Sequence, residues 1–266
     1  MNRKTFEKFR SLIYEKSGIS LGEQKEALVS ARVGKRMRAL QIGDFDAYYA
    51  YVVRDESGQE MVELLDAIST NVTSFFREPQ HFDLLHSLLT TWKNQGQRRF
   101  RIWSAASSTG EEPYTIAMTV LESIGNRDVD MRILATDIST RVLAKCQEGV
   151  YEPHKLDGVP AALRDRFFDR MQDGKQFQYR ANDAMKKLLV FRRLNLATPP
   201  FPMRGPLDVV FCRNVMIYFD NDVRTRLLEE IHRLLKPGGY LMVGHAESLT
   251  GLVSSFRTVR PSVYTK

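Results

Sequence analysis

The sequence predicts an α/β fold with a doubly wound, mainly parallel sheet, joined to a small all-α N-terminal domain and interrupted by an inserted β-subdomain. From about residue 100, strand-like apolar stretches alternate with helical stretches, which is typical of a parallel sheet with helices on both faces. Residues 1–70 show only helical periodicity, and a segment at about 150–192 breaks the alternation. We therefore predict an all-helical domain at 1–70, a linker segment and helix at 71–98, and a sheet domain at 99–266 that carries the insertion.

The N-terminal domain is predicted to be helical because its apolar residues recur every three or four positions. Phe6, Phe9, Leu12 and Ile13 follow this spacing. The stretch DFDAYYAYVV is predicted to form a further helix capped by Asp44, and MVELLDAIST another that ends near residue 70. No strand pattern competes with these helices.

The sheet domain alternates predicted strands with predicted helices. The last residues, FRTVRPSVYTK, suit an antiparallel hairpin at the sheet edge, because two short strands around Pro261 leave no room for a crossover helix. The insertion contains one helix and a polar strand, FQYR, and is too long for an ordinary connection. The strands are RFRIWSAA, DMRILATD, LDVVFCRN and GGYLMVGH, and the helices are EEPYTIAMTVLESIG, STRVLAKCQEG and DNDVRTRLLEEIHRLLK.

Composition excludes several classes of protein. The 266 residues carry 39 Lys and Arg against 32 Asp and Glu, a formal net charge of +7, and 43% are hydrophobic, which excludes general disorder. No apolar run approaches the ~20 residues that cross a bilayer, and the first residues lack the apolar block of a secretory signal. Two cysteines, Cys146 and Cys212, exclude a disulfide scaffold. We expect a cytoplasmic protein without membrane insertion, whose charge suits nucleic acid, an anionic membrane surface or an acidic protein.

A candidate ligand site lies at the ends of the first two predicted strands, where open α/β sheets bind ligands. The loop SSTG after the first strand matches neither G-x-G-x-x-G nor G-K-[ST]. Glu111 and Glu112, at the start of the next helix, favour a ligand with a cationic group, although acids there also complement a helix dipole. Asp137, at the end of the second strand, suits either two ribose hydroxyls or the cap of the following helix. Together these features favour S-adenosylmethionine.

Five motifs occur in order: NVTSFFRE (71–78), WSAASSTGEEPYT (103–115), ATDIS (135–139), FCRNVMIYF (211–219) and LKPGGYL (235–241). This set resembles the chemotaxis receptor methyltransferases of the CheR type, which methylate receptor glutamates with S-adenosylmethionine. LKPGGYL recurs across many methyltransferases, whereas NVTSFFRE together with FCRNVMIYF is far more specific. The resemblance spans most of the chain. It implies a class I methyltransferase-like fold, a linker that contributes to the active site, and S-adenosylhomocysteine as the product.

The resemblance also implies which residues contact the cofactor. The chain departs from the wider methyltransferase pattern at Ala106 and Ser108, where that pattern has glycines, but Ala and Ser are the smallest substitutes. Whether Glu111 or Glu112 makes the acidic contact stays open. The implied cofactor contacts are Asn71, Thr73, Arg77, Glu111, Asp137, Asn195, Leu196, Arg213 and Asn214.

The chemistry implied by the resemblance needs alignment more than proton transfer. A glutamate with a pKa near ~4.3 is already ionised at neutral pH, so its methylation needs no general base. The enzyme must place a carboxylate oxygen at roughly 3–3.5 Å from the methyl group. We predict that Arg77 orients the substrate or cofactor carboxylate and that Tyr218 donates a hydrogen bond near the methyl group. Alternatively, Arg77 pairs with Glu78 and Tyr218 only packs.

A basic cluster of Arg32, Lys35, Arg36 and Arg38 lies in the stretch 27–43, which contains no acid. In the CheR type, methylation sites lie on acidic helical bundles, so the resemblance implies that this cluster docks the cytoplasmic helical bundle of a chemoreceptor. A solvated helix face is the alternative. In some members the β-subdomain binds a peptide at the receptor C-terminus, and strand FQYR suits such pairing. The alternative is that the insertion is a structural cap on the cofactor pocket. We expect a monomer that binds no nucleic acid.

Two other functions remain open at this point. A nucleic-acid methyltransferase would suit the net charge, but ATPPF precedes the fourth predicted strand, whereas the N-P-P-[YF] box of such enzymes follows it. The other possible function is a non-catalytic module that binds S-adenosylmethionine and signals through the insertion. We predict no metal site because the histidines lack ligand spacing. They are His81 and His86, five apart, and the isolated His154, His232 and His245.

Overall fold

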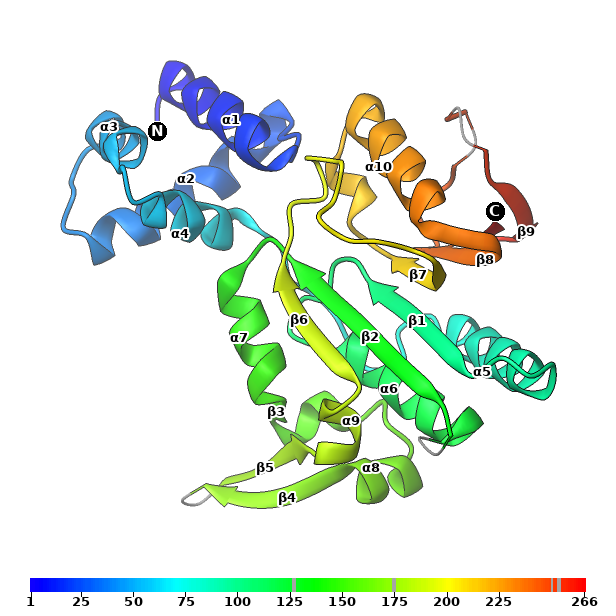
Figure 1. Cartoon of the computed structure of the whole chain (residues 1–266). Coiled ribbons are helices and arrows are strands. Elements are labelled where there is room, and N and C mark those ends of the chain that lie inside the picture. Colours follow the sequence, from blue (N-terminus) through cyan, green and yellow to red (C-terminus); the bar gives the residue numbers. More distant parts are fainter. Residues whose placement is uncertain (126–127, 174–175, 250, 253–254) are drawn as a thin grey trace.

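The computed structural model (Figure 1) describes residues 1–125, 128–173, 176–249, 251–252 and 255–266. Its main sheet has seven strands in the order β6-β2-β1-β7-β8-β10-β9. The neighbours from β6 to β8 are parallel, and β10 is antiparallel to both β8 and β9. The predicted mainly parallel sheet with an antiparallel C-terminal hairpin is confirmed. The strands are β1 (Arg99–Ser104), β2 (Asp130–Asp137), β6 (Leu189–Arg193), β7 (Leu207–Cys212), β8 (Leu235–Val243), β9 (Arg257–Arg260) and β10 (Val263–Thr265).

Helices cover both faces of this sheet. Successive residues of a strand point to opposite faces, and in the inner strands both sets of residues are apolar. On one face Ile102 and Phe211 belong to the buried cluster that α5 and α6 complete. On the other face Trp103 and Val210 pack with the apolar residues of α10. Strands buried on both faces carry continuous apolar runs, and every residue of β7 is buried. The helices are α5 (Gln80–Asn94), α6 (Glu111–Ile124), α7 (Thr140–Glu148) and α10 (Asn221–Leu234).

The N-terminal unit has its own core and lies over the carboxyl ends of β2 and β6 (Figure 1). Asn2 and Asp44 cap the first and third helices by accepting hydrogen bonds from backbone N–H groups. None of the helices in the described ranges is long and apolar enough to cross a membrane. The unit comprises α1 (Arg3–Ser17), η1 (Glu23–Lys25), α2 (Glu26–Ala39), α3 (Phe45–Arg54) and α4 (Gln59–Ile68).

The turn after α1 joins the N-terminal unit to the sheet domain. Ile19 and Phe219 form an isolated antiparallel bridge, and the Ser20 N–H donates to the Tyr218 carbonyl at 2.8 Å. The turn requires Gly18, whose φ is +72° and whose added Cβ would overlap the Ala197 side chain. The helical unit is therefore fixed against η3 (Met216–Tyr218), the short helix that carries Tyr218.

The inserted subdomain is a three-stranded antiparallel sheet in the order β3-β5-β4 with short helices beside it. A β-subdomain was predicted, but with only one helix and one strand. The predicted end of the insertion near residue 192 is wrong, because Leu189–Arg193 forms β6 and pairs with β2 in the main sheet. This edge strand is half exposed and ends in arginines, so it lacks the apolar run of the inner strands. The elements are β3 (Val150–Tyr151), η2 (Pro153–Leu156), α8 (Ala161–Phe167), β4 (Phe168–Asp173), β5 (Gln176–Ala181) and α9 (Asp183–Lys186).

Candidate functional site

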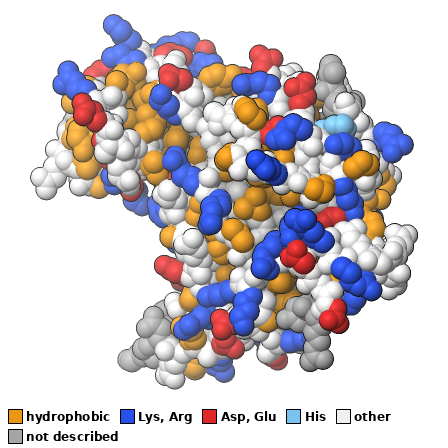
Figure 2. Space-filling model, viewed as in Figure 1, with side chains coloured by type: hydrophobic (Ala, Val, Ile, Leu, Met, Phe, Trp, Pro, Cys, Tyr) orange, Lys and Arg blue, Asp and Glu red, His pale blue; other side chains and the backbone are white. Residues whose placement is uncertain are grey.

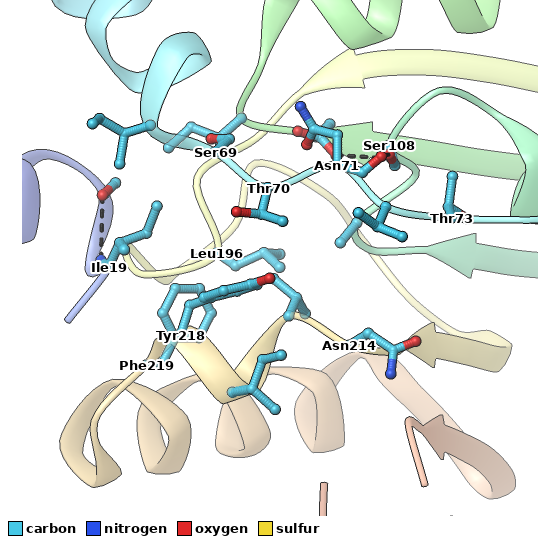
Figure 3. Close-up of a pocket in the computed structure, with 18 of the residues that line it drawn as sticks. Ile19, Ser69, Thr70, Asn71, Thr73, Ser108, Leu196, Asn214, Tyr218 and Phe219 are labelled. Atoms are coloured by element: carbon cyan, nitrogen blue, oxygen red, sulfur yellow. Dashed lines mark hydrogen bonds between the residues drawn. The ribbon is translucent and has the colours of Figure 1, made fainter. Parts of the chain in front are cut away.

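A pocket of about 420 Å³ lies where the helical unit meets the carboxyl ends of the parallel strands. Its walls combine the connection between α1 and α2, the linker after α4, and the loops after β1, β2, β6 and β7. Figure 3 shows Asn71 and Ser108 on one side of the cavity and Tyr218 and Phe219 on the other. Because β1 lies between β2 and β7, the strand order reverses here, which is where open α/β sheets bind ligands.

Asp137, the last residue of β2, holds the loop after β1 and faces the pocket. Its Oδ2 accepts from the Ser108 N–H at 2.9 Å and its Oδ1 from the Ser139 N–H at 3.0 Å. Burial raises the pKa of Asp137, and these two N–H groups oppose that shift. The following helix is capped by the Ser139 side chain, which accepts from the Val142 N–H. Asp137 therefore keeps acceptor capacity for a ligand, and its ribose contact stays a prediction.

Arg213, directly after β7, joins the linker to the start of α6 through buried ion pairs. Its side chain is 1% exposed, with Nη1 3.1 Å from Glu112 Oε2 and Nη2 3.1 Å from Glu78 Oε2. Nη2 also donates to the backbone carbonyl of Arg77. Burial opposes ionisation of Glu78, but the guanidinium and the His245 N–H outweigh it, so the Glu78 pKa is lowered. Burial raises the pKa of Glu112 despite the same guanidinium.

The residues on either side of Arg77 in the linker have unusual backbone conformations. Phe76 and Glu78 have φ angles of +52° and +58°, which cost about 1–3 kcal/mol each for such residues and persist only where their surroundings impose them. Arg77 Nη1 donates to the Val72 carbonyl at 3.0 Å, and the guanidinium lies in the pocket wall. Glu78, proposed above as an alternative partner for Arg77, is instead paired with Arg213.

Glu247 is a site residue that no sequence motif indicated. Its side chain is buried just after β8, and its Oε2 accepts from the N–H groups of Asn214 at 2.6 Å and Gly244 at 2.7 Å. Its Oε1 accepts from the Ile217 N–H at 3.2 Å. Glu247 therefore fixes the loop that presents Asn214 and Tyr218. An acid in the loop that follows an apolar strand is the signal that could have identified it.

Most of the predicted site residues surround the pocket, but Glu111 does not line it. The Glu111 carboxylate is 1% exposed, accepts from the Thr109 hydroxyl at 2.6 Å and lies 3.8 Å from Lys155 Nζ. The pocket wall contains Glu112 in its place. The Arg213 side chain is held by protein partners, and its predicted cofactor contact stays a prediction. The predicted residues that line the pocket are Asn71, Thr73, Arg77, Asp137, Asn195, Leu196, Arg213, Asn214 and Tyr218.

The basic cluster on α2 is not the uncompensated patch that the sequence suggested. Arg36 donates to both carboxylate oxygens of the buried Glu60, each at 2.7 Å. Arg32 donates to the last carbonyls of α4 and lines the pocket. The compensating acid comes from another helix, so an acid-free stretch of sequence did not reveal it. Lys35 and Arg38 are exposed, and their docking role stays a prediction.

The histidines are also arranged differently from the sequence prediction. His81 on α5 and His245 after β8 are neighbours, with ring centroids 5.5 Å apart, and Glu78 lies beside both. Burial lowers the pKa of His81 to about 4, so its ring is neutral at pH 7. The prediction that His245 is isolated is therefore wrong, because ligand spacing on one helix cannot reveal residues brought together by the fold.

Comparison with known proteins decides the family. Residues 71–265 match the family model described as "CheR methyltransferase, SAM binding domain", and residues 4–69 match "CheR methyltransferase, all-alpha domain". The chain belongs to the CheR methyltransferase family. The chemotaxis protein methyltransferase 2 of Pseudomonas aeruginosa is 41% identical over 98% of this chain and 92% of its own length. The chemotaxis protein methyltransferase of Escherichia coli is 35% identical over 97% of this chain and 89% of its own length.

This CheR-family chain is therefore an S-adenosylmethionine-dependent methyltransferase of chemotaxis, as the resemblance implied. The pocket suits that cofactor. Asp137 offers carboxylate oxygens where ribose hydroxyls bind in such sheets, and Glu112 brings a second acid into the pocket wall. Leu196 adds an apolar surface to the same pocket, which suits an adenine ring.

Proposed function

We propose that this chain transfers the methyl group of S-adenosylmethionine to glutamate side chains of chemoreceptors, forming glutamyl methyl esters. The observation that supports this proposal is that Arg77 and Tyr218 line the same pocket as Asp137 and Glu112. Two acids there suit a cationic cofactor, and one arginine beside them suits an anionic acceptor. A carboxylate acceptor fits because it needs orientation but no base.

The chain's own residues bind the two reactants, orient them and keep water out. The cofactor supplies an electrophilic methyl group on a sulfonium. Arg77 presents a planar pair of donors to the acceptor carboxylate, and the Tyr218 hydroxyl adds a donor from the opposite wall. Because an anion reacts with a cation, charge is lost in the transition state. A tight cationic clamp on the carboxylate would therefore stabilise the ground state more than the transition state. Arg77 therefore acts by alignment, and Val72 and Phe219 add apolar surface to the pocket wall.

We expect Arg77→Ala to lower methyl transfer by about 100-fold, because misplacing the acceptor by about 1 Å has an effect of that size. Tyr218→Phe removes one hydrogen bond and should lower it by about tenfold. The measurement uses tritium-labelled cofactor with receptor-containing membranes, and counts label that mild alkali releases as methanol. Arg192→Ala, at an exposed arginine, serves as the matched control.

The same assay separates this proposal from its alternatives. Alkali-labile label that depends on Arg77 supports glutamate methylation. Label that stays in nucleic acid after alkali treatment would mean a nucleic-acid methyltransferase. Tight cofactor binding with no transfer to receptors or nucleic acid would mean a non-catalytic module.

Receptor docking through α2 gives a separate prediction. Reversing the exposed Lys35 and Arg38 to Glu should slow methylation about tenfold at low ionic strength, because charge complementarity mainly speeds association. Cofactor affinity, measured by calorimetry, should stay unchanged. Arg54→Glu, at another exposed arginine of the helical unit, is the control. Equal methylation rates for the two variants in low salt would remove Lys35 and Arg38 from the docking surface.

We further propose that the chain acts as a monomer in the cytoplasm, on the helical bundle of a receptor. A receptor C-terminal peptide is proposed to bind the inserted subdomain. β4 pairs along the whole of β5, whereas β3 pairs only with Tyr179 and Arg180 near its end. In the described part of this sheet, the first half of β5 therefore has no neighbouring strand on the β3 side. An open edge accepts an extended peptide as a further strand. Figure 2 shows Lys and Arg side chains on this lower part of the molecule with Asp and Glu side chains among them.

A further inference from the structure

A group of three potential metal ligands lies behind the pocket wall, where α5, the linker and the end of β8 meet. Glu78, His81 and His245 each offer one ligand atom, and these atoms lie within 4.8 Å of one another. His81 Nδ1 is 3.5 Å from Glu78 Oε2, and His245 Nε2 is 3.9 Å from the same oxygen. In tetrahedral zinc sites with bonds of about 2.0–2.1 Å, neighbouring ligand atoms lie about 3.4 Å apart. The two distances from Glu78 Oε2 to the histidine nitrogens are already close to that value.

His81 provides an independent indication of a missing partner. Its residue is 1% exposed, and neither ring nitrogen makes a hydrogen bond to any of the described residues. Buried polar groups without partners are rare in folded proteins, and each one calls for a water, an ion or a functional role.

We propose that Glu78, His81 and His245 form a site for a divalent transition-metal ion with the ligand preferences of Zn²⁺. Two imidazoles and one carboxylate match the donors that zinc takes. His245 is about half exposed, so an ion enters from its side and keeps water in the fourth position. His245 also lies on the loop after β8 and can turn toward the other two ligands.

The site is coupled to the transfer pocket through Glu78. The same Oε2 atom that faces both histidines lies 3.1 Å from Arg213 Nη2, and that nitrogen also bonds the Arg77 carbonyl. An ion on Glu78 displaces the Arg213 guanidinium from it, because a dication and a guanidinium repel each other at one oxygen. The site is therefore inhibitory: occupancy loosens the segment that holds Arg77.

Isothermal titration of ZnCl₂ into the tag-free chain of 266 residues tests the site without cofactor or receptor. We expect one saturable Zn²⁺ per chain. His245→Ala, at an exposed residue, and His81→Asn should each weaken binding at least about tenfold, since even groups behind the ligands contribute that much. His86→Ala and His154→Ala, at exposed histidines outside the group, should leave binding unchanged.

Absence of saturable zinc binding, or equal binding by the wild type and His245→Ala, would overturn the proposal. The coupling has its own test, which rests on the proposed function. Zinc at its measured Kd should halve methyl transfer by the wild type, and the same concentration should leave His245→Ala fully active. Zinc binding without this difference would overturn the coupling alone, whereas failure of methyl transfer without zinc would concern only the proposed function.

Discussion

Replacing Arg213 with Ala is expected to lower the free energy of unfolding by about 3–5 kcal/mol, the usual effect of removing one partner from a buried ion pair. Arg213 is 1% exposed and pairs with Glu78 and Glu112, whose side chains are each 12% exposed. Without the guanidinium, two carboxylates face each other in a poorly solvated space, and the Arg77 carbonyl loses its donor. Urea denaturation followed by circular dichroism measures the change.

Two further variants separate charge from packing at Arg213. Arg213→Lys restores one positive charge without the forked donors and should recover only part of the lost stability. Arg192→Ala, at an exposed arginine on β6, should change the free energy of unfolding by less than about 0.5 kcal/mol. A loss below about 1 kcal/mol in Arg213→Ala, well under the range for buried pairs, would show that the ion network does not hold the linker.

Replacing Asp137 with Ala is expected to weaken binding of S-adenosylhomocysteine by about 100-fold or more. The carboxylate is predicted to accept two ribose hydrogen bonds, and bonds to a charged group contribute about 1.5–3 kcal/mol each. The variant also frees the Ser108 and Ser139 N–H groups, which the carboxylate holds in the native loop. Isothermal titration with the purified chain gives the dissociation constants directly.

Asp130 provides a matched control for Asp137 at the opposite end of the same strand. It is exposed and pairs with Arg101, and neither residue lines the pocket. Asp130→Ala should leave the affinity within about twofold of the wild type. If both variants bind S-adenosylhomocysteine equally well, Asp137 only stabilises the loop after β1 and does not bind the ribose.

The sheet could be predicted from the sequence because burial leaves a local pattern. β7 is buried at every position and β1 and β2 at most of theirs, and apolar runs of this length between helical stretches are typical of inner parallel strands. β6 was missed because an edge strand is half exposed and needs no such run. The motifs likewise located Asp137 and Arg77, which lie at the ends of recognisable segments.

What the sequence did not show depends on contacts between distant segments. Glu60 neutralises Arg36 from another helix, so the apparent basic patch was smaller than the acid-free stretch implied. Glu247 reaches three N–H groups across a loop, and His245 meets His81 only because β8 ends beside α5. Glu112 took the place of Glu111 because neighbouring helix positions point about 100° apart, and only the packing decides which one faces inward.

The bridge between Ile19 and Phe219, with the Ser20 bond to Tyr218, has a consequence for protein engineering. The residues that join the helical unit to the sheet domain also line the pocket. Transplanting the first 70 residues from a relative to retarget the enzyme would therefore replace part of the pocket wall. A working hybrid must keep the recipient's turn around Gly18, or exchange the segment bearing Tyr218 together with it.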